Sequence, residues 1–136
     1  MSELDDIDYT ISLFPENYDL KLLYCNSRYP CPDDDANLSM ISFLKNRYPK
    51  FEVGYSGHEI GINATCIAIA KDVPIIERHI TFNKQAIGTD HECSLDYRDM
   101  QMLQQFIKNY SNLKGDPKKY FSSNIIKLKT INEIEI

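Results

Sequence analysis

The sequence predicts an α/β fold in which parallel strands alternate with helices. An opening helical pattern is followed by three short apolar segments, and each of these is followed in turn by a helical apolar pattern. Prolines and polar turns separate the segments. Strands and helices in strict alternation favour right-handed crossovers and a parallel sheet, as in a doubly wound sheet or a barrel. A chain of 136 residues suits one modest domain.

The first two elements are a helix and a strand. Apolar residues recur at helical spacings of three and four until Pro15 ends the pattern; they are Leu4, Ile7, Ile11 and Phe14. The segment LKLLYC, residues 20–25, is short, apolar and typical of a strand. A polar turn with two prolines then leads to Asn37, which we expect to be the N-cap of the next helix.

The middle of the chain predicts a helix, a strand and a second helix. One helical face over residues 38–48 is apolar, formed by Leu38, Ile41, Leu44 and Tyr48, and Pro49 stops the helix. Residues 51–55 form the second strand. Residues 62–70 are apolar nearly all round, so we expect a helix buried on several sides.

The last strand and helix follow the same order. Residues 73–79 form the third strand, and a loop with Gly88 and Asp90 leads to Ser94, the expected cap of the last helix. The apolar stripe of that helix comprises Tyr97, Met100, Leu103, Phe106, Ile107 and Tyr110.

Composition narrows the class of protein. The formal net charge of -5 provides no basic stripe, so we expect no nucleic-acid partner. No apolar run approaches the roughly 20 residues of a membrane span, and the acidic start MSELDDIDY is unlike a secretory signal. We therefore expect a cytoplasmic chain without a membrane partner. The four cysteines form no CxxC pair, which favours small buried hydrophobes over zinc ligands or disulfides.

Polar residues gather where the predicted strands end, which is where parallel alternating folds bind ligands. They are Ser27, Arg28 and Tyr29 after the first strand, Ser56 and His58 after the second, and Glu77, Arg78, His79 and Asp90 at and beyond the end of the third. Strand side chains alternate in direction, so Glu77 and His79 point one way and Arg78 the other.

These residue types permit two interpretations each. His58 and His79 could form half of a divalent-metal site, or each could be a hydrogen-bonded structural residue. Glu77 could orient a histidine or pair with Arg78. His91 lies in a polar loop, where we expect it to be solvated.

The serines and the tyrosine carry similar alternatives. Ser27 and Ser56 could bind a phosphate or carboxylate, with Gly57 allowing close approach of the backbone, or they could be ordinary turn residues. Tyr29, before Pro30, could contact a ligand or pack against a helix.

Three stretches in order, LLYCNSRYPCPDDDANL, VGYSGHEIG and IIERHITFNKQAIGTDHECSL, resemble the carboxyl half of the catalytic barrel of sialic acid synthases. The resemblance covers roughly residues 4–114. It implies a partial (β/α)8 TIM barrel, with barrel strands six to eight and their helices in residues 1–114. Residues 115–136 form a divergent tail that resembles neither the linker nor the second domain of that family.

The resemblance also implies chemistry. The family condenses phosphoenolpyruvate with N-acetylmannosamine or a related amino sugar, releasing phosphate and forming a nonulosonic acid. Its motifs imply that His58 and His79 hold a divalent metal, manganese or magnesium, as a Lewis acid. The same motifs imply that Ser27 and Ser56 contact phosphoenolpyruvate, that Tyr29 contacts the amino sugar and that Asp90 contacts sugar hydroxyls.

The resemblance further implies that barrel strands one to five, with the lysines that grip the phosphate, are not among these residues. We therefore expect the isolated chain to be inactive or nearly so, and to form a homo-oligomer or pair with a separate N-terminal half chain. The alternatives are a non-catalytic metal or sugar-phosphate binding module, one chain of a split enzyme, and an aldolase-like barrel of another substrate class.

Overall fold

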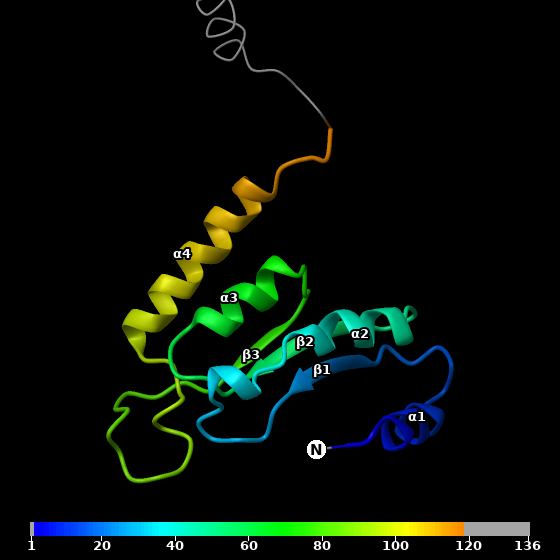
Figure 1. Ribbon diagram of the computed structural model, residues 1–136, viewed down its shortest axis with the longest axis horizontal. Coiled ribbons are helices and arrows are strands. Elements are labelled where there is room, and N and C mark those ends of the chain that lie inside the picture. The colour runs from blue at the N-terminus through cyan, green and yellow to red at the C-terminus, as the bar shows by residue number, and fades with distance from the viewer. Residues whose placement is uncertain (1, 119–136) are drawn as a thin grey trace, which may run out of the picture.

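The computed structural model describes residues 2–118 and confirms the predicted α/β fold with parallel strands (Figure 1). Its sheet has the order β1-β2-β3 and both pairings are parallel. The elements along the chain are α1 (Leu4–Ser12), β1 (Lys21–Cys25), the 3-10 turn η1 (Asp33–Asp35), α2 (Ser39–Arg47), β2 (Glu52–Gly57), α3 (Asn63–Ala70), β3 (Ile76–Arg78) and α4 (Tyr97–Lys114). The predicted tail, residues 115–136, lies largely outside the described residues, so its boundary stays a prediction.

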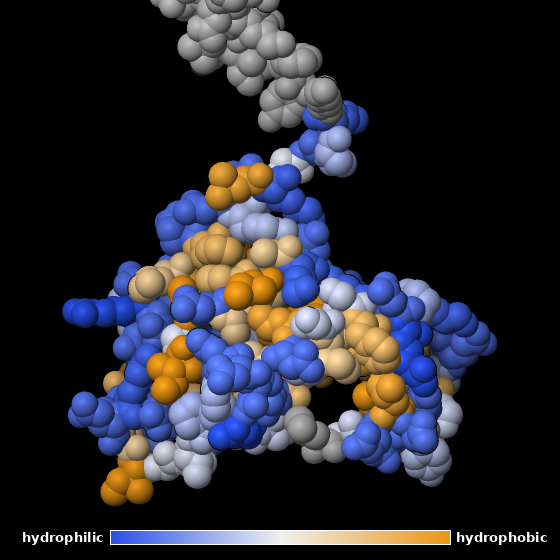
Figure 2. Space-filling model, viewed as in Figure 1, coloured by the Kyte–Doolittle hydropathy of each residue, from blue (hydrophilic) through white to orange (hydrophobic). Residues whose placement is uncertain are grey.

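Helices cover one face of this sheet. α2 contacts β1 and β2, α3 contacts β2, and α4 packs against α3 (Figure 1). The apolar core between the sheet and these helices includes Ile41, Tyr55, Ala64 and Ala68. In Figure 2 apolar residues form a band across the middle of the face shown, over the region where Figure 1 draws α3, α2 and the strands. Helices therefore bury one face of the sheet.

The strand register determines which side chains share each face. Tyr24 lies opposite Tyr55, and both belong to the helix-covered side. Cys25 lies opposite Ser56, and Ser56 lies opposite Glu77, so these three residues share the other face. The ends of all three strands meet at one edge of the sheet, which is where the predicted site residues lie.

α1 is attached to α2 by apolar and polar contacts. Leu4, Ile7 and Ile11 pack beside Leu44 and Tyr48. The carboxylate of Asp8 accepts hydrogen bonds from the Tyr48 hydroxyl at 2.7 Å and from Arg47 Nη2 at 2.5 Å. These two hydrogen bonds, that from Tyr48 above all, lower the pKa of Asp8 below its ordinary value. These contacts hold α1 against α2, the helix that covers β1.

Both predicted helix caps are wrong. Asn37 has a positive φ of 39° and stands one residue outside the N-cap position, which Leu38 occupies without a side-chain hydrogen bond. Ser94 is not a cap either, because the chain stays extended through Leu95, which bridges to Ile80. The cap of α4 is Asp96, whose side chain accepts from the backbone N–H of Asp99 at 2.9 Å.

Two strands differ in extent from their predictions, and one helix differs in burial. The second strand, predicted over residues 51–55, is β2 (Glu52–Gly57), so Ser56 lies within it and not after it. The third strand is Ile76–Arg78 and not 73–79, because only these residues pair with Tyr55 to Gly57 of β2. α3 buries Ala64, Thr65, Ala68 and Ile69, as its apolar composition predicts, but Ile67 is half exposed.

The four cysteines are free thiols; Cys31 and Cys93 are buried, whereas Cys25 and Cys66 are half-buried. Burial raises the pKa of the Cys31 and Cys93 thiols, which disfavours the thiolate. This fits the interpretation of those two as small hydrophobes. Within residues 2–118, no helix combines the length and the apolar character needed to cross a membrane.

Candidate metal and substrate site

Three rings meet at the carboxyl ends of the strands. Tyr29 follows β1, His58 follows β2 and His79 follows β3. The centroids of Tyr29 and His58 are 3.9 Å apart in a stacked arrangement, and those of His58 and His79 are 5.2 Å apart. Tyr29 also meets His79 edge-on at 5.6 Å. The structure therefore brings both predicted metal ligands and the predicted sugar contact into one cluster.

The ring of His58 is buried and its orientation is set by a backbone carbonyl. Its Nδ1 lies 2.7 Å from the carbonyl oxygen of Asn26, and Cys25 Sγ is 3.8 Å away. A carbonyl can only accept, so Nδ1 carries the proton of this hydrogen bond. In the neutral ring Nε2 then keeps its lone pair, which is the arrangement common among metal-binding histidines.

His79 is partly exposed and lies beside Asp90. Its Nδ1 is 3.7 Å from Asp90 Oδ2, a distance at which a protonated ring would form an ion pair. The loop is held in place because Ser94 donates to the Asp90 carbonyl from its N–H at 3.1 Å and its hydroxyl at 2.7 Å. Leu95 N–H donates to the His79 carbonyl at 2.8 Å. Asp90 therefore belongs to the same cluster as the two histidines.

His91 differs from its predicted environment. Its Nδ1 lies 2.8 Å from Thr81 Oγ1 and the residue is half-buried, so it is not simply solvated. The contact fastens the two ends of the loop between β3 and α4. His91 thus has a loop-closing contact, distinct from the cluster of His58 and His79.

Ser56 and Glu77 form the polar pair on the sheet face below the rings. They are opposite each other in the β2–β3 register, and Ser56 Oγ donates to Glu77 Oε1 at 2.7 Å. Glu77 thus bonds Ser56 and not Arg78, because the Arg78 side chain points to the helix-covered side and bonds Thr65 there. The alternative in which Glu77 orients a histidine stays a prediction. Ser27 is not brought into this pair: it is exposed and lines a hollow between β1 and α1 with Cys25.

The Tyr29 hydroxyl is a neutral hydrogen-bonding group in this setting. Burial raises the pKa of Tyr29 above its ordinary value, and the nearby acidic groups, Cys25 and Asp90 among them, act in the same direction. The phenol therefore keeps its proton at neutral pH. It can donate a hydrogen bond to a ligand oxygen while its ring stacks on His58.

A buried ion pair behind the cluster was missed by sequence reasoning. Arg78 Nη1 lies 2.8 Å from Glu59 Oε1, and the side chains are 3% and 0% exposed. Glu59 Oε2 accepts from the Tyr55 hydroxyl at 3.1 Å, and burial beside this carboxylate raises the pKa of Tyr55. A Cβ at Gly57 would lie 2.5 Å from Glu59 Oε2, so only glycine leaves room for the pair.

A sequence signal for this pair did exist. Arg78 alternates with Glu77 and His79, so its side chain must enter the apolar layer under the helices, where an unpaired charge is costly. Such a residue requires a buried acid nearby. Glu59, directly after His58, is one of the acidic residues near a strand end that could reach it.

His58 and His79 could supply two ligands, about half of the coordination shell of a divalent metal. Two imidazoles converge, and the His58 ring is oriented from behind by a carbonyl. Within the described residues, no group of three His, Cys, Asp or Glu side chains is placed to hold an ion. A metal held by His58 and His79 would take its remaining ligands from water and substrate oxygens, which is common for catalytic sites.

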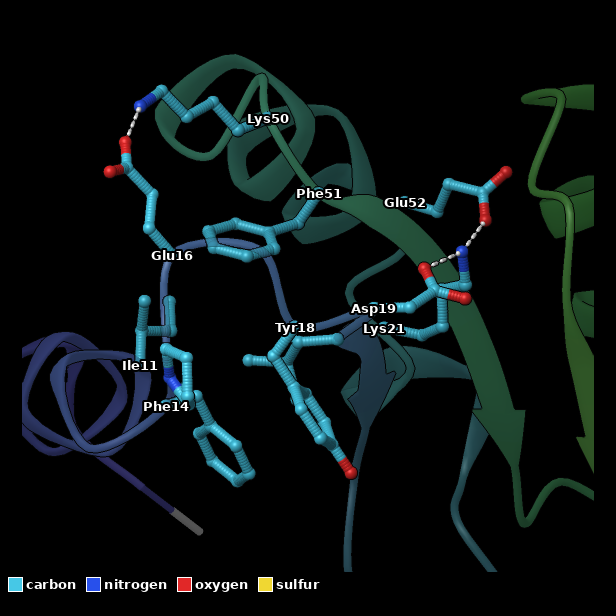
Figure 3. Close-up of a pocket in the computed structure, with 11 residues that line it drawn as sticks. Ile11, Phe14, Glu16, Tyr18, Asp19, Lys21, Lys50, Phe51 and Glu52 are labelled. Carbon is cyan, nitrogen blue, oxygen red and sulfur yellow. Dashed lines mark hydrogen bonds and ion pairs between the residues drawn. The ribbon is translucent and has the colours of Figure 1, made fainter.

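A second hollow lies at the opposite, amino end of β1 and β2 (Figure 3). Its volume is about 350 Å³ and its rim carries two lysines. Lys21 Nζ lies 2.7 Å from Asp19 and 2.5 Å from Glu52, and Lys50 lies 3.5 Å from Glu16. Both cations are therefore neutralised by neighbouring carboxylates, and parallel alternating folds bind their ligands at the other end of the strands.

The chain resembles known proteins along most of its length. The model of the NeuB family matches residues 1–119. N-acetylneuraminate-9-phosphate synthase of Drosophila melanogaster is 39% identical over 92 residues, covering 68% of this chain and 25% of that protein. N,N'-diacetyllegionaminic acid synthase of Campylobacter jejuni is 32% identical over 120 residues, covering 85% of this chain and 36% of that protein. The chain thus spans between a quarter and just over a third of these relatives.

A solved structure shows the same arrangement of elements. The crystal structure of N-acetylneuraminic acid synthetase from Leptospira borgpetersenii, in complex with citrate, matches with a TM-score of 0.80 and 29% identity. The match covers 97% of this chain and 46% of that one. The predicted fold, part of a (β/α)8 barrel, is confirmed. With the family model matching 119 of its residues, the chain belongs to the NeuB family.

Proposed function

We propose that this chain supplies the metal and sugar-binding part of a nonulosonic acid synthase. The reaction condenses phosphoenolpyruvate with N-acetylmannosamine or a related amino sugar and releases phosphate. The observation that carries the proposal is the convergence of Tyr29, His58 and His79 at the strand ends, with Asp90 beside them. The names of the relatives, which are synthases of sialic and legionaminic acids, support the same reaction class.

His58 and His79 would hold the cation, Mn²⁺ or Mg²⁺, through their ring nitrogens. When bound, the cation supplies a Lewis acid for the aldehyde oxygen of the open-chain amino sugar. The Asn26 carbonyl keeps the His58 ring in the tautomer whose Nε2 is available. Tyr29, stacked on His58, excludes water from one side of that ring.

The remaining polar groups would bind the substrates. Tyr29 would donate a hydrogen bond from its hydroxyl to the amino sugar, and the exposed carboxylate of Asp90 would accept hydrogen bonds from sugar hydroxyls. Ser56 would turn its hydroxyl from Glu77 to an oxygen of phosphoenolpyruvate, since a hydroxyl rotates to suit its acceptor. Ser27, exposed at the end of β1, would contact the same substrate.

The rest of the barrel would come from outside residues 2–118. It could belong to a longer protein of which this sequence is part, to a separate N-terminal half chain, or to further copies. The resemblance assigns the phosphate-gripping lysines to those other strands. A hydrogen bond from a charged group is worth about 1.5–3 kcal/mol, so without those lysines we expect no measurable condensation by the 136 residues alone.

A chimaera tests the proposed reaction. Residues 2–118 would replace the matching segment of the Campylobacter jejuni relative, and phosphate release from phosphoenolpyruvate would be measured with and without each amino sugar. We expect release that requires both an amino sugar and Mn²⁺ or Mg²⁺. His58→Ala and His79→Ala should lower the rate at least about 100-fold, because a preorganised electrostatic group is removed. His91→Ala is the matched control, because its ring contacts Thr81 instead.

The chimaera would contradict the proposal in two ways. If neither histidine substitution changes phosphate release by a folded chimaera, His58 and His79 do not hold a metal that the reaction needs. Release from phosphoenolpyruvate with non-amino aldoses alone would favour an aldolase-like barrel of another substrate class. Circular dichroism of each variant shows whether it is folded.

Metal binding by the 136-residue chain gives a second prediction. We expect Mn²⁺ to bind saturably, and His58→Ala and His79→Ala each to weaken binding at least about tenfold. His91→Ala should bind like the wild type. The decrease of the free-Mn²⁺ signal in electron paramagnetic resonance measures binding directly. Equal binding by all four proteins would remove these histidines as ligands, and binding without condensation in the chimaera would favour the non-catalytic module.

Self-association of the isolated chain is the third prediction. Within residues 2–118 the outer edges of β1 and β3 carry no strand partner, and the loop after β3 exposes Ile80, Phe82 and Ile87. Unpaired strand edges and apolar surface favour association. We expect light scattering to give a mass above the 15.8 kDa of one chain. A monomer that unfolds cooperatively would contradict the need for a partner.

A further inference from the structure

We propose that Glu59 and Arg78 are a pair of positioning residues that hold His58, His79 and the Asp90 loop at fixed relative places. This role rests on the proposed function, because it concerns groups behind the proposed metal ligands. Neither residue points into the ligand-facing side of the sheet, so neither is a catalytic residue.

The pair lies directly beside both histidines in the chain. Glu59 follows His58, and Arg78 precedes His79. Arg78 lies opposite Gly57 in the β2–β3 register, on the helix-covered face. The ion pair therefore joins the two backbone segments from behind, one residue away from each imidazole.

Arg78 connects three segments through its two terminal nitrogens. The two N–H groups of Nη1 are shared among three acceptors, Glu59 Oε1 at 2.8 Å, the Gly61 carbonyl at 2.9 Å and Thr65 Oγ1 at 2.7 Å. Nη2 donates to the Glu59 carbonyl at 2.8 Å and to the Cys93 carbonyl at 3.0 Å. The planar guanidinium thus fixes the turn after His58 and the loop that carries Asp90 in one geometry.

Glu59 is held just as firmly from the other side. Its Oε1 accepts from the N–H of Thr65 at 2.9 Å and from the Thr65 hydroxyl at 2.6 Å, and its Oε2 accepts from the Tyr55 hydroxyl at 3.1 Å. Thr65 lies in the first turn of α3 and Tyr55 lies in β2. The carboxylate therefore ties the turn after His58 to a rigid helix and strand.

Stability alone does not account for such a pair. Removing two charges from water costs about as much as their attraction returns, and apolar replacements of similar volume often leave a protein as stable or more so. Arg78 Nε also lies buried without a hydrogen-bond partner, so the arrangement is not optimal for stability. What apolar side chains cannot reproduce is the set of directional bonds to Gly61, Glu59 and Cys93.

The double variant Glu59→Leu/Arg78→Met separates positioning from stability in the 136-residue chain. It removes both charges together, so neither is left buried alone, and we expect it to stay folded. In metal-free protein, the ring protons of His58 should lose the shift that the stacked Tyr29 ring gives them, and the contact between the rings of His58 and His79 should weaken. Nuclear magnetic resonance measures both, and His91 serves as the internal control.

Mn²⁺ binding by the same variant is the second readout. We expect the affinity to fall at least about tenfold, as it does when a group that orients a metal ligand is removed. The matched control is Asp8→Leu/Arg47→Met, which removes a partly exposed ion pair between α1 and α2. It should leave the His58 and His79 spectra and the affinity unchanged.

The possible outcomes differ clearly. A folded double variant whose histidine spectra and Mn²⁺ affinity equal those of the wild type would overturn the proposal. If the wild type binds no Mn²⁺, the metal role fails, and the metal-free spectra still decide whether the pair positions the rings. If the double variant unfolds, Arg78→Lys decides: it keeps the charge but cannot span Gly61 and Cys93, so unchanged spectra there would equally overturn the proposal.

Discussion

Arg78→Met is expected to destabilise the folded chain by about 3–5 kcal/mol, because it leaves the Glu59 carboxylate buried without its counter-ion. Glu59 is 0% exposed and would keep only its bonds from Thr65 and Tyr55. Methionine fills much of the volume of the arginine stem, so the effect is one of charge and hydrogen bonds and not of packing. An effect of this size is a large part of the stability of a small domain.

Urea unfolding at one fixed protein concentration measures the change, since association shifts apparent stability. The control is Arg28→Met, which breaks the exposed ion pair with Asp35 and should cost no more than about 1 kcal/mol. Adding Glu59→Leu to Arg78→Met should restore most of the lost stability. Equal losses of stability from the two arginine substitutions would show that breaking the buried ion pair costs no more than breaking an exposed one, which contradicts the prediction.

Ile41→Ala is expected to cost about 2–5 kcal/mol through the cavity that it leaves. Ile41 is completely buried in α2, in the core that also contains Tyr55, Ala64 and Ala68. The small neighbours from α3 cannot expand to fill the space, so we expect little relaxation. The cavity would lie beside Tyr55, which donates to Glu59, so the substitution should also loosen the ion pair.

The control for this substitution is Ile67→Ala on α3, where the side chain is 52% exposed. The same chemical change in a helix should there cost less than about 1 kcal/mol, because alanine favours helices and little buried surface is removed. Thermal and urea unfolding of both variants at matched concentration give the comparison. A cost for Ile41→Ala as small as that for Ile67→Ala would mean that the α2 contact with the sheet is not a packed core.

The order of the elements was predictable because periodicity and proline act locally. The three- and four-residue spacings and the prolines at 15 and 49 bound the first two helices without reference to the rest of the chain. Helix starts were not predictable at Asn37 and Ser94, because the tertiary contacts of each segment decide where the chain turns. At Ser94 the Ile80–Leu95 bridge keeps the chain extended past the expected cap.

The direction of the strands made the location of the site predictable, but not the hydrogen-bond partners of its side chains. Parallel strands bring their carboxyl ends together, so His58 and His79 could be expected to meet. Alternation along β3 already points Arg78 away from Glu77. The partner that Glu77 does take, Ser56, depends on the register between β2 and β3, which the sequence does not show. Alternation indicates that Arg78 needs a buried acid, but that the acid is Glu59 follows from how the turn after β2 folds against α3, which no spacing in the sequence specifies.

The buried ion pair has a consequence for how the chain folds. β3 pairs with β2 through only three residues, so its hydrogen bonds alone discriminate weakly between registers. A slip of one residue would turn Arg78 outward and drive Glu77 into the apolar layer, leaving Glu59 facing a second carboxylate in place of its counter-ion. The two like charges would raise the free energy of the slipped state above that of the native state. The ion pair therefore also favours the register in which His79 faces His58.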